Sequence, residues 1–172
     1  QRVLELDRSQ PEFTQTFADY FHQRVTDERI ERGQELLNQY EPFLTELTRK
    51  YGVPGRYLVA FWGLETNFGS YLGKMPTLDS LATLACDPRR SAFFTDELMQ
   101  ALALLERESL SPADMRGSWA GAMGHTQFMP TSYLSNAVDF NGDGRRDIWS
   151  DDPTDALAST AAYLKNAGWN KG

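Results

Sequence analysis

One glutamate stands in a segment whose other residues are mostly apolar. Helical spacing predicts that Glu65 lies on the apolar stripe of this helix. The stripe consists of Leu58, Phe61 and Trp62. Removing a carboxyl group from water disfavours its charged form and raises its pKa, as a general acid near neutral pH requires. We therefore predict that Glu65 is a catalytic acid and that Gly69 ends its helix and opens a cleft. The alternative is a surface glutamate, or a buried one paired with a core hydroxyl.

A matched second carboxylate is missing from the sequence. Glycoside hydrolases usually place two carboxyl groups on either side of the bond that they cleave. The dispersed candidates here are Asp79, Asp87 and Asp96. A reaction that needs only one carboxylate therefore fits the sequence better.

Oxygen-bearing residues recur in the segment 139–147, which reads DFNGDGRRD. An EF-hand loop takes ligands from positions 1, 3, 5, 7 and 9 and has glycine at position 6. The matching residues are Asp139, Asn141, Asp143, Arg145 through its backbone carbonyl, and Asp147, with Gly144 as the glycine. The loop predicts a structural calcium site, against the alternative of a solvated acidic turn. Ser150 stands at position 12, where a bidentate glutamate is expected.

Composition limits the classes of function. The chain has 172 residues, which fits one domain spanning 1–172, and a formal net charge of -7. That charge argues against nucleic acid or an anionic membrane as the main partner. No apolar run is long enough for a membrane span, and the lone Cys86 is predicted to be a small core residue.

The apolar pattern predicts a mainly α-helical single domain. No alternating strand of convincing length appears. The predicted helices are two or three within 14–50, then 54–66, 77–85, 93–108, 111–115, a short helix after Pro130, and 154–166.

Five segments resemble the membrane-bound lytic transglycosylase B family in order and spacing. They read ETNFG (65–69), LDSLATL (78–84), PRR (88–90), GSWAGAMGHTQFMP (117–130) and VDFNGDG (138–144). The similarity extends from about Phe17 to the end of the chain. It implies a lysozyme-like α fold and non-hydrolytic cleavage of the β-1,4 bond between N-acetylmuramic acid and N-acetylglucosamine. The product would carry a 1,6-anhydromuramyl end.

The resemblance also implies roles for individual residues. Glu65 matches the family's catalytic glutamate, which acts as acid and then as base. The residues that match the site lining are Ser118, Gln127 and Tyr163. Those that match the border of the saccharide groove are Tyr20, Arg89, Arg90 and Phe128. A later aspartate closes the family's calcium loop, and Asp155 is the best match, with Asp151 and Asp152 as rivals.

Each of these positions has a simpler interpretation. Ser118 could cap a helix after Gly117, Gln127 could satisfy backbone groups in a tight loop, and the arginine pair could form a solvated face. The three aromatic residues could be core residues. His125 stands without a second nearby ligand in the sequence, so a zinc site is not predicted.

Two other functions remain as alternatives. One is a hydrolytic muramidase on the same fold, and the other is a calcium-dependent glycan-binding module in which Glu65 is dispensable. The resemblance implies peptidoglycan strands as the substrate, with cell-wall synthesis or hydrolysis enzymes as further partners. It places the protein in the periplasm, either soluble or lipid-anchored to the outer membrane. Family members usually continue past residue 172, so we expect a C-terminal segment of the groove to be missing.

Overall fold

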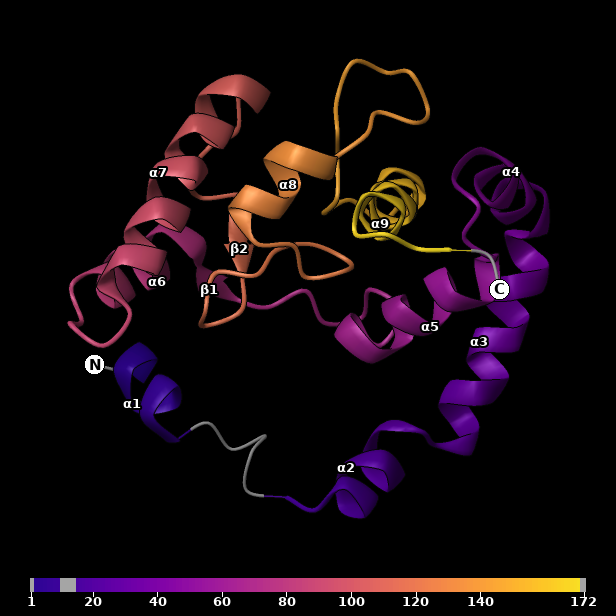
Figure 1. Ribbon diagram of the computed structural model, residues 1–172, viewed down its shortest axis with the longest axis horizontal. Helices are drawn as coiled ribbons and strands as arrows, with labels where there is room; N and C mark the ends of the chain where they lie inside the picture. Colours follow the sequence, from indigo (N-terminus) through magenta and orange to yellow (C-terminus); the bar gives the residue numbers. More distant parts are fainter. Residues whose placement is uncertain (1, 10–14, 171–172) are drawn as a thin grey trace.

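The computed structural model describes residues 2–9 and 15–170, which form a mainly helical domain (Figure 1). The elements in chain order are α1 (Arg2–Ser9), α2 (Phe17–Arg24), α3 (Asp27–Gln39), α4 (Glu41–Tyr51), α5 (Gly55–Thr66), β1 (Met75–Pro76), α6 (Thr77–Ala85), α7 (Ser91–Glu108), β2 (Arg116–Gly117), α8 (Pro130–Asn136) and α9 (Thr154–Asn166). The two short strands pair antiparallel, with Met75 opposite Gly117. The prediction of a mainly α fold is confirmed.

The helices enclose two hydrophobic cores. One lies among α6, α7 and α8, and its buried residues include Leu81, Phe94, Leu104, Met123 and Tyr133. The other lies among α4, α5 and α9, and its buried residues include Leu47, Leu58, Trp62, Leu157 and Ala161. Helix α9 contacts α4, α5 and α8, so it joins the two halves. Helix α5 therefore rests on the second core and faces the open centre of the molecule with its other side (Figure 1).

Local capping explains most helix boundaries. The hydroxyls of Thr16 and Thr26 accept hydrogen bonds from the third residues of α2 and α3, as N-caps do. Gly52 ends α4 in the left-handed conformation (φ +77°), as C-terminal glycines commonly do. The predicted helices 77–85 and 154–166 have the observed bounds, and 17–51 holds three helices.

Two expectations are wrong, and one helix was not predicted. Residues 111–115 form a turn instead of a helix, because Asp114 N–H bonds to the carbonyl of Ser111 and the Met115 carbonyl accepts Thr77 N–H at 2.9 Å. These bonds lead the chain directly into β2. Cys86 is exposed at the end of α6, not in the core. Helix α1 was not predicted, since it depends on an ion pair between Asp7 and two distant arginines.

The ring of Phe68 wedges between α3 and α5. Its backbone has a φ of +59°, a conformation that bulky residues adopt only when the surroundings enforce it. A Cβ atom added to Gly63 on α5 would lie 2.7 Å from the ring, whereas one added to Gly33 on α3 would lie at an ordinary 3.6 Å. Gly63 is therefore needed for the close approach, and Gly33 is not.

We expect Gly63→Ala to lower the free energy of unfolding by about 1–3 kcal/mol, because the added methyl group overpacks the wedge. The measurement is urea unfolding followed by circular dichroism. Gly33→Ala is the matched control and should be neutral or stabilising by up to about 1 kcal/mol, through helix propensity alone. Equal effects of the two substitutions would contradict this account of Phe68.

Candidate active site

Helix α5 presents Glu65 on its open side. The row Leu58, Trp62 and Thr66 is buried, and each residue lies one turn after the last. Glu65 and Phe61 form the adjacent row, in which Phe61 is 38% exposed. The prediction that Glu65 shares the stripe of Leu58 and Trp62 is thus wrong in detail. Because Glu65 directly precedes Thr66, it lies about 100° around the helix axis from that stripe. It therefore stands beside the stripe and faces the centre of the molecule.

The chain reverses sharply after Glu65. The helix ends at Thr66, because Asn67, Phe68 and Gly69 all adopt positive φ angles. The Thr66 hydroxyl accepts a hydrogen bond from Gly69 N–H at 3.0 Å, which holds the reversal against the helix end. The predicted role of Gly69 as the helix stop is correct only in part, since Asn67 is the residue that caps α5.

The carboxyl group of Glu65 has the electrostatics of a general acid. Desolvation by neighbouring protein atoms raises its pKa above the ordinary value although the side chain is accessible, and the Arg24 guanidinium has a smaller, lowering effect. Within residues 2–9 and 15–170, no hydrogen bond or ion pair engages this carboxyl. Its oxygens are therefore free to meet a ligand.

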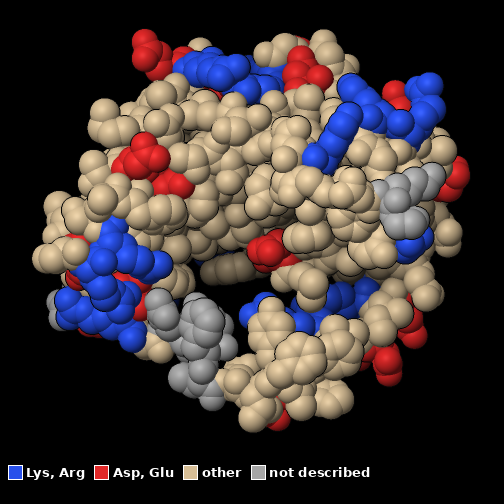
Figure 2. Space-filling model, in the orientation of Figure 1, with Lys and Arg blue, Asp and Glu red and all other residues tan. Residues whose placement is uncertain are grey.

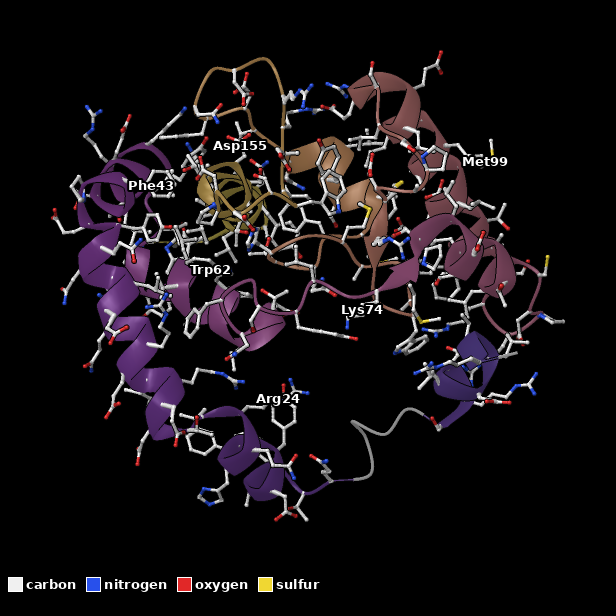
Figure 3. The ribbon with its side chains drawn as sticks, turned by 180° about the vertical axis from the view of Figure 1, so that it is seen from behind. Arg24, Phe43, Trp62, Lys74, Met99 and Asp155 are labelled. Atoms are coloured by element: carbon white, nitrogen blue, oxygen red, sulfur yellow. The ribbon has the colours of Figure 1, made fainter. Side chains whose placement is uncertain are left out.

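The surface around α5 is concave. Figure 2 shows a deep hollow on this face, between the helical body and the N-terminal helices, with acidic atoms on one side and basic atoms on the other. Figure 3 shows Arg24 reaching from α2 across this hollow toward α5.

A buried histidine connects α5 to the loops around it. His125 Nδ1 accepts a hydrogen bond from Trp62 Nε1 at 2.9 Å, and His125 Nε2 lies 2.6 Å from the Ser150 carbonyl. These partners require the tautomer with hydrogen on Nε2. The Thr66 hydroxyl donates to the His125 carbonyl at 2.7 Å. Sequence spacing gave no sign of this network, and it contributes to the position of Glu65 without touching a ligand.

Ser118 and Gln127 organise the loop 117–130. The Ser118 hydroxyl accepts hydrogen bonds from the N–H groups of Ala120 and Ala122, at 3.2 and 3.1 Å. Gln127 has a positive φ of 55°, and its side-chain amide donates to the carbonyls of Gly124 and Leu72. Gln127 thus makes the backbone contacts of its simpler interpretation, whereas Ser118 caps a turn and not a helix. A role of either residue toward ligand remains a prediction.

The predicted aromatic residues lie in two places. Phe128 is buried and its ring centroid is 5.8 Å from that of Tyr163, which is 39% exposed. Tyr20 on α2 is 40% exposed and lies under the Arg24 guanidinium at 5.3 Å. Tyr20 and Tyr163 are therefore not core residues, and both remain candidates for contact with sugar.

Arg89 and Arg90 both bind Asp7 of α1. Their guanidinium groups pair with the two oxygens of this buried carboxylate, and Arg89 also donates to the Asp7 carbonyl at 2.9 Å. The arginines are nevertheless 47% and 41% exposed at their side chains. They fasten α1 to the loop after α6, and their outer atoms remain accessible.

Three acidic groups converge at the loop that precedes α9. Carboxylate oxygens of Asp139, Asp143 and Asp155 lie within 4.8 Å of one another. Asp155 is buried and accepts hydrogen bonds from Phe140 N–H at 2.8 Å and Asp147 N–H at 3.0 Å. Burial is the largest influence on Asp155 and raises its pKa. An oxygen-only cluster of this kind matches what Ca²⁺ prefers.

The neighbours of this cluster complete an oxygen-rich cavity of about 110 Å³. Its lining residues are Asn141, Asp143, Asp147, Ser150, Asp152 and Asp155. Asp151 is not among them, and Arg145 is exposed. The geometry thus favours Asp155 over Asp151 as the closing residue of the loop.

Known proteins share this sequence and this arrangement. The family model described as the transglycosylase SLT domain matches residues 1–172. The chain belongs to this family. The membrane-bound lytic murein transglycosylase B of Escherichia coli strain K12 is 44% identical over 149 residues, which cover 86% of the chain and 41% of that protein.

Solved transglycosylase structures superpose closely on the domain. SltB3 from Pseudomonas aeruginosa, in complex with NAG-NAM-pentapeptide, is 47% identical with a TM-score of 0.93, covering 99% of this chain and 46% of the other. The Escherichia coli lytic transglycosylase Slt35, in complex with calcium, is 42% identical with a TM-score of 0.89, covering 99% and 54%. The transglycosylase domain thus spans less than half the length of the curated relative. Among the described residues, no helix combines the length and apolarity that crossing a bilayer requires.

We expect Arg24→Gln to raise the pKa of Glu65 further, because the substitution removes the positive charge that favours the carboxylate. The pKa is measured by NMR titration of the labelled carboxyl carbon. Arg49→Gln, an exposed arginine on α4, is the control and should leave the titration unchanged. A lower pKa of Glu65 in Arg24→Gln would contradict the roles assigned to desolvation, which raises this pKa, and to the Arg24 charge, which lowers it.

Proposed function

We propose that this chain is the catalytic domain of a peptidoglycan lytic transglycosylase. It cleaves the β-1,4 bond between N-acetylmuramic acid and N-acetylglucosamine without water and forms a 1,6-anhydromuramyl end. The observation that carries the proposal is the carboxyl group of Glu65, which is accessible, has a raised pKa and is unpaired within the described part of the chain. The 44% identity to a lytic murein transglycosylase supports the substrate class.

Glu65 performs both proton transfers. Its protonated carboxyl donates to the glycosidic oxygen as the bond from that oxygen to C1 breaks. The resulting carboxylate then accepts the proton of the C6 hydroxyl while that oxygen bonds to C1. A raised pKa suits the first step, and the nearby Arg24 stabilises the carboxylate that exists between the steps.

A single carboxylate distinguishes this mechanism from a hydrolytic one. Among the described residues, Arg24 is the charged group that shifts the pKa of Glu65. A muramidase would need a second carboxylate about 5–9.5 Å away. The oxocarbenium-like centre is stabilised instead by the N-acetyl group of the substrate. A structure of SltB3 in complex with NAG-anhNAM-pentapeptide supports an anhydro product.

The remaining site residues position the strand. We assign Tyr20 and Tyr163 to stacking against sugar rings, since both expose aromatic faces. Gln127 and Ser118 shape the loop beneath the reacting bond. Arg89 and Arg90 remain available to peptide carboxylates through their exposed atoms. Phe128 supports Tyr163 from below, because the two rings are in contact.

Calcium in an EF-hand-like loop is the second part of the proposal. Asp139, Asp143 and Asp155 would hold the ion, with Asn141, Asp147 and the Arg145 carbonyl as further oxygen donors. The calcium complex of the 42% identical Slt35 supports this choice of metal. The ion would neutralise the clustered carboxylates and fix the loop before α9, which is a structural role.

The compartment follows from the substrate. Peptidoglycan lies in the periplasm, and the Escherichia coli relative is membrane-bound. We place this domain in the periplasm, either soluble or held by a lipid anchor at the outer membrane. Cell-wall synthesis or hydrolysis enzymes would be its partners there, because cleavage and extension of the same strands must be coordinated.

The test of the activity is mass spectrometry of the fragments that the chain releases from purified peptidoglycan. We expect anhydromuramyl ends, and a rate that falls by roughly 10²–10⁴-fold in Glu65→Gln, because the general acid is lost. Glu46→Gln, an exposed glutamate on α4, should retain the rate. Reducing ends would establish a muramidase, and binding of strands without cleavage would establish a glycan-binding module.

We expect Ca²⁺ to stabilise the chain, by about 2.7 kcal/mol at a concentration one hundred times its Kd. Thermal unfolding with and without chelator measures this effect. Asp155→Asn should remove most of the stabilisation, whereas the matched Asp151→Asn, outside the cluster, should keep it. The assignment is wrong if Asp151→Asn is the substitution that abolishes the response.

A further inference from the structure

A small apolar pocket lies between α3 and α5, next to the end of α2. Its volume is about 240 Å³. The apolar side chains that line it are Val25, Ile30, Leu37, Val59, Ala60, Leu64 and Phe68. Of the larger ones, Val25, Ile30 and Leu64 are 38%, 45% and 41% exposed. The domain thus leaves a contiguous apolar surface uncovered here.

Three arginines stand around this apolar pocket. Arg24 comes from α2, Arg29 from α3 and Arg56 from α5. None of them has a carboxylate within 4.0 Å in the described part of the chain, whereas six other arginines do. Three guanidinium groups without a carboxylate of the described residues in salt-bridge distance are therefore gathered at one pocket, and of these Arg29 donates hydrogen bonds to Asn67 Oδ1 and the Arg24 carbonyl. The pocket is complementary to a ligand that carries both carboxylate and small aliphatic groups.

The pocket adjoins the catalytic glutamate. Leu64 lines the pocket, and the next residue is Glu65 on the neighbouring face of α5. Arg24 lines the pocket and is also close enough to Glu65 to lower its pKa. Figure 3 shows Arg24 between α2 and α5. A ligand held at Glu65 could therefore extend a branch into the pocket.

We propose that this pocket is a subsite for the peptide that branches from the glycan strand. The proposal rests on the proposed function and names a second determinant of its substrate. Peptide carboxylates would pair with the guanidinium groups of Arg56 and Arg24, and small aliphatic side chains would cover Ala60 and Leu64. The volume is below the roughly 300–1,000 Å³ of pockets that hold a whole ligand, so it suits one part of a ligand anchored elsewhere.

A sugar ring fits this pocket poorly. Its hydroxyl groups would be desolvated against the apolar side chains of the pocket, at a cost that only the three arginines and Gln34 could offset. A neutral sugar would also leave the three arginines without counter-charge. The relative SltB3 forms a complex with a disaccharide that carries a pentapeptide, so a ligand with both parts is accepted by a domain 47% identical to this one.

The test is the ratio of kcat/KM on peptide-bearing strands to kcat/KM on strands stripped of peptide by an amidase. We expect the chain to prefer peptide-bearing strands. Arg56→Gln, which removes one charged donor, and Ala60→Trp, which fills the pocket, should each lower the ratio about tenfold. The matched Arg49→Gln, an exposed arginine on α4 outside the pocket, should keep it. An unchanged ratio in both pocket variants would overturn the proposal.

A binding measurement separates this proposal from the proposed function. Calorimetry with Glu65→Gln compares NAG-NAM-pentapeptide with the same disaccharide lacking peptide. We expect about tenfold tighter binding of the peptide compound, and loss of that difference when Arg56→Gln is added. If this binding difference is found but the unsubstituted chain cleaves no strands, the transglycosylase function is contradicted and the peptide subsite is supported. Equal binding of the two compounds would contradict the peptide subsite, whether or not cleavage occurs.

Discussion

The hydrogen bonds of His125 join three parts of the domain that are far apart in sequence. The ring accepts from Trp62 on α5 and donates to the Ser150 carbonyl at the end of the acidic loop, while its own carbonyl accepts from Thr66. All these groups lie in or beside a buried region, where an unpaired donor costs about 1–3 kcal/mol. The helix that carries Glu65, the loop 117–130 and the acidic loop must therefore keep one relative position. Gly69 completes the arrangement, since a side chain there would strike the ring.

This constraint explains how an accessible carboxyl group acquires a raised pKa, as a general acid requires. The buried row of Leu58, Trp62 and Thr66 fixes the rotation of α5, so Glu65 cannot turn away from the concave surface. Protein atoms around the hollow exclude part of its water, and Arg24 on a separate helix opposes that effect. The pKa of Glu65 therefore depends on the distance between α2, which carries Arg24, and α5. Neither desolvation nor charge is set by the local sequence around Glu65.

The helices were predictable where their signals are local. Capping threonines, Gly52 and apolar spacing define α2 to α6 and α9 within a few residues. Two of the failures depend on partners distant in sequence. Helix α1 is held by Asp7 through Arg89 and Arg90, and residues 111–115 are turned by a bond to Thr77. In the site, the identity of Glu65 could be predicted from its apolar setting, but its exact face could not. Rows one residue apart differ by only 100°.

Carboxylates and arginines are concentrated at different places in the domain, and the two places have different functions. Carboxylates gather in the acidic loop, where Asp139 alone accepts hydrogen bonds from the N–H groups of Gly142, Asp143 and Gly144. These backbone donors help to hold the loop in shape. The same loop supplies the Ser150 carbonyl to His125. Disorder of the loop would therefore leave a buried N–H unpaired next to α5. Arginines gather instead at the pocket between α3 and α5, where no carboxylate of the described residues lies within 4.0 Å of Arg24 or Arg56, and there positive charge is available for recognition.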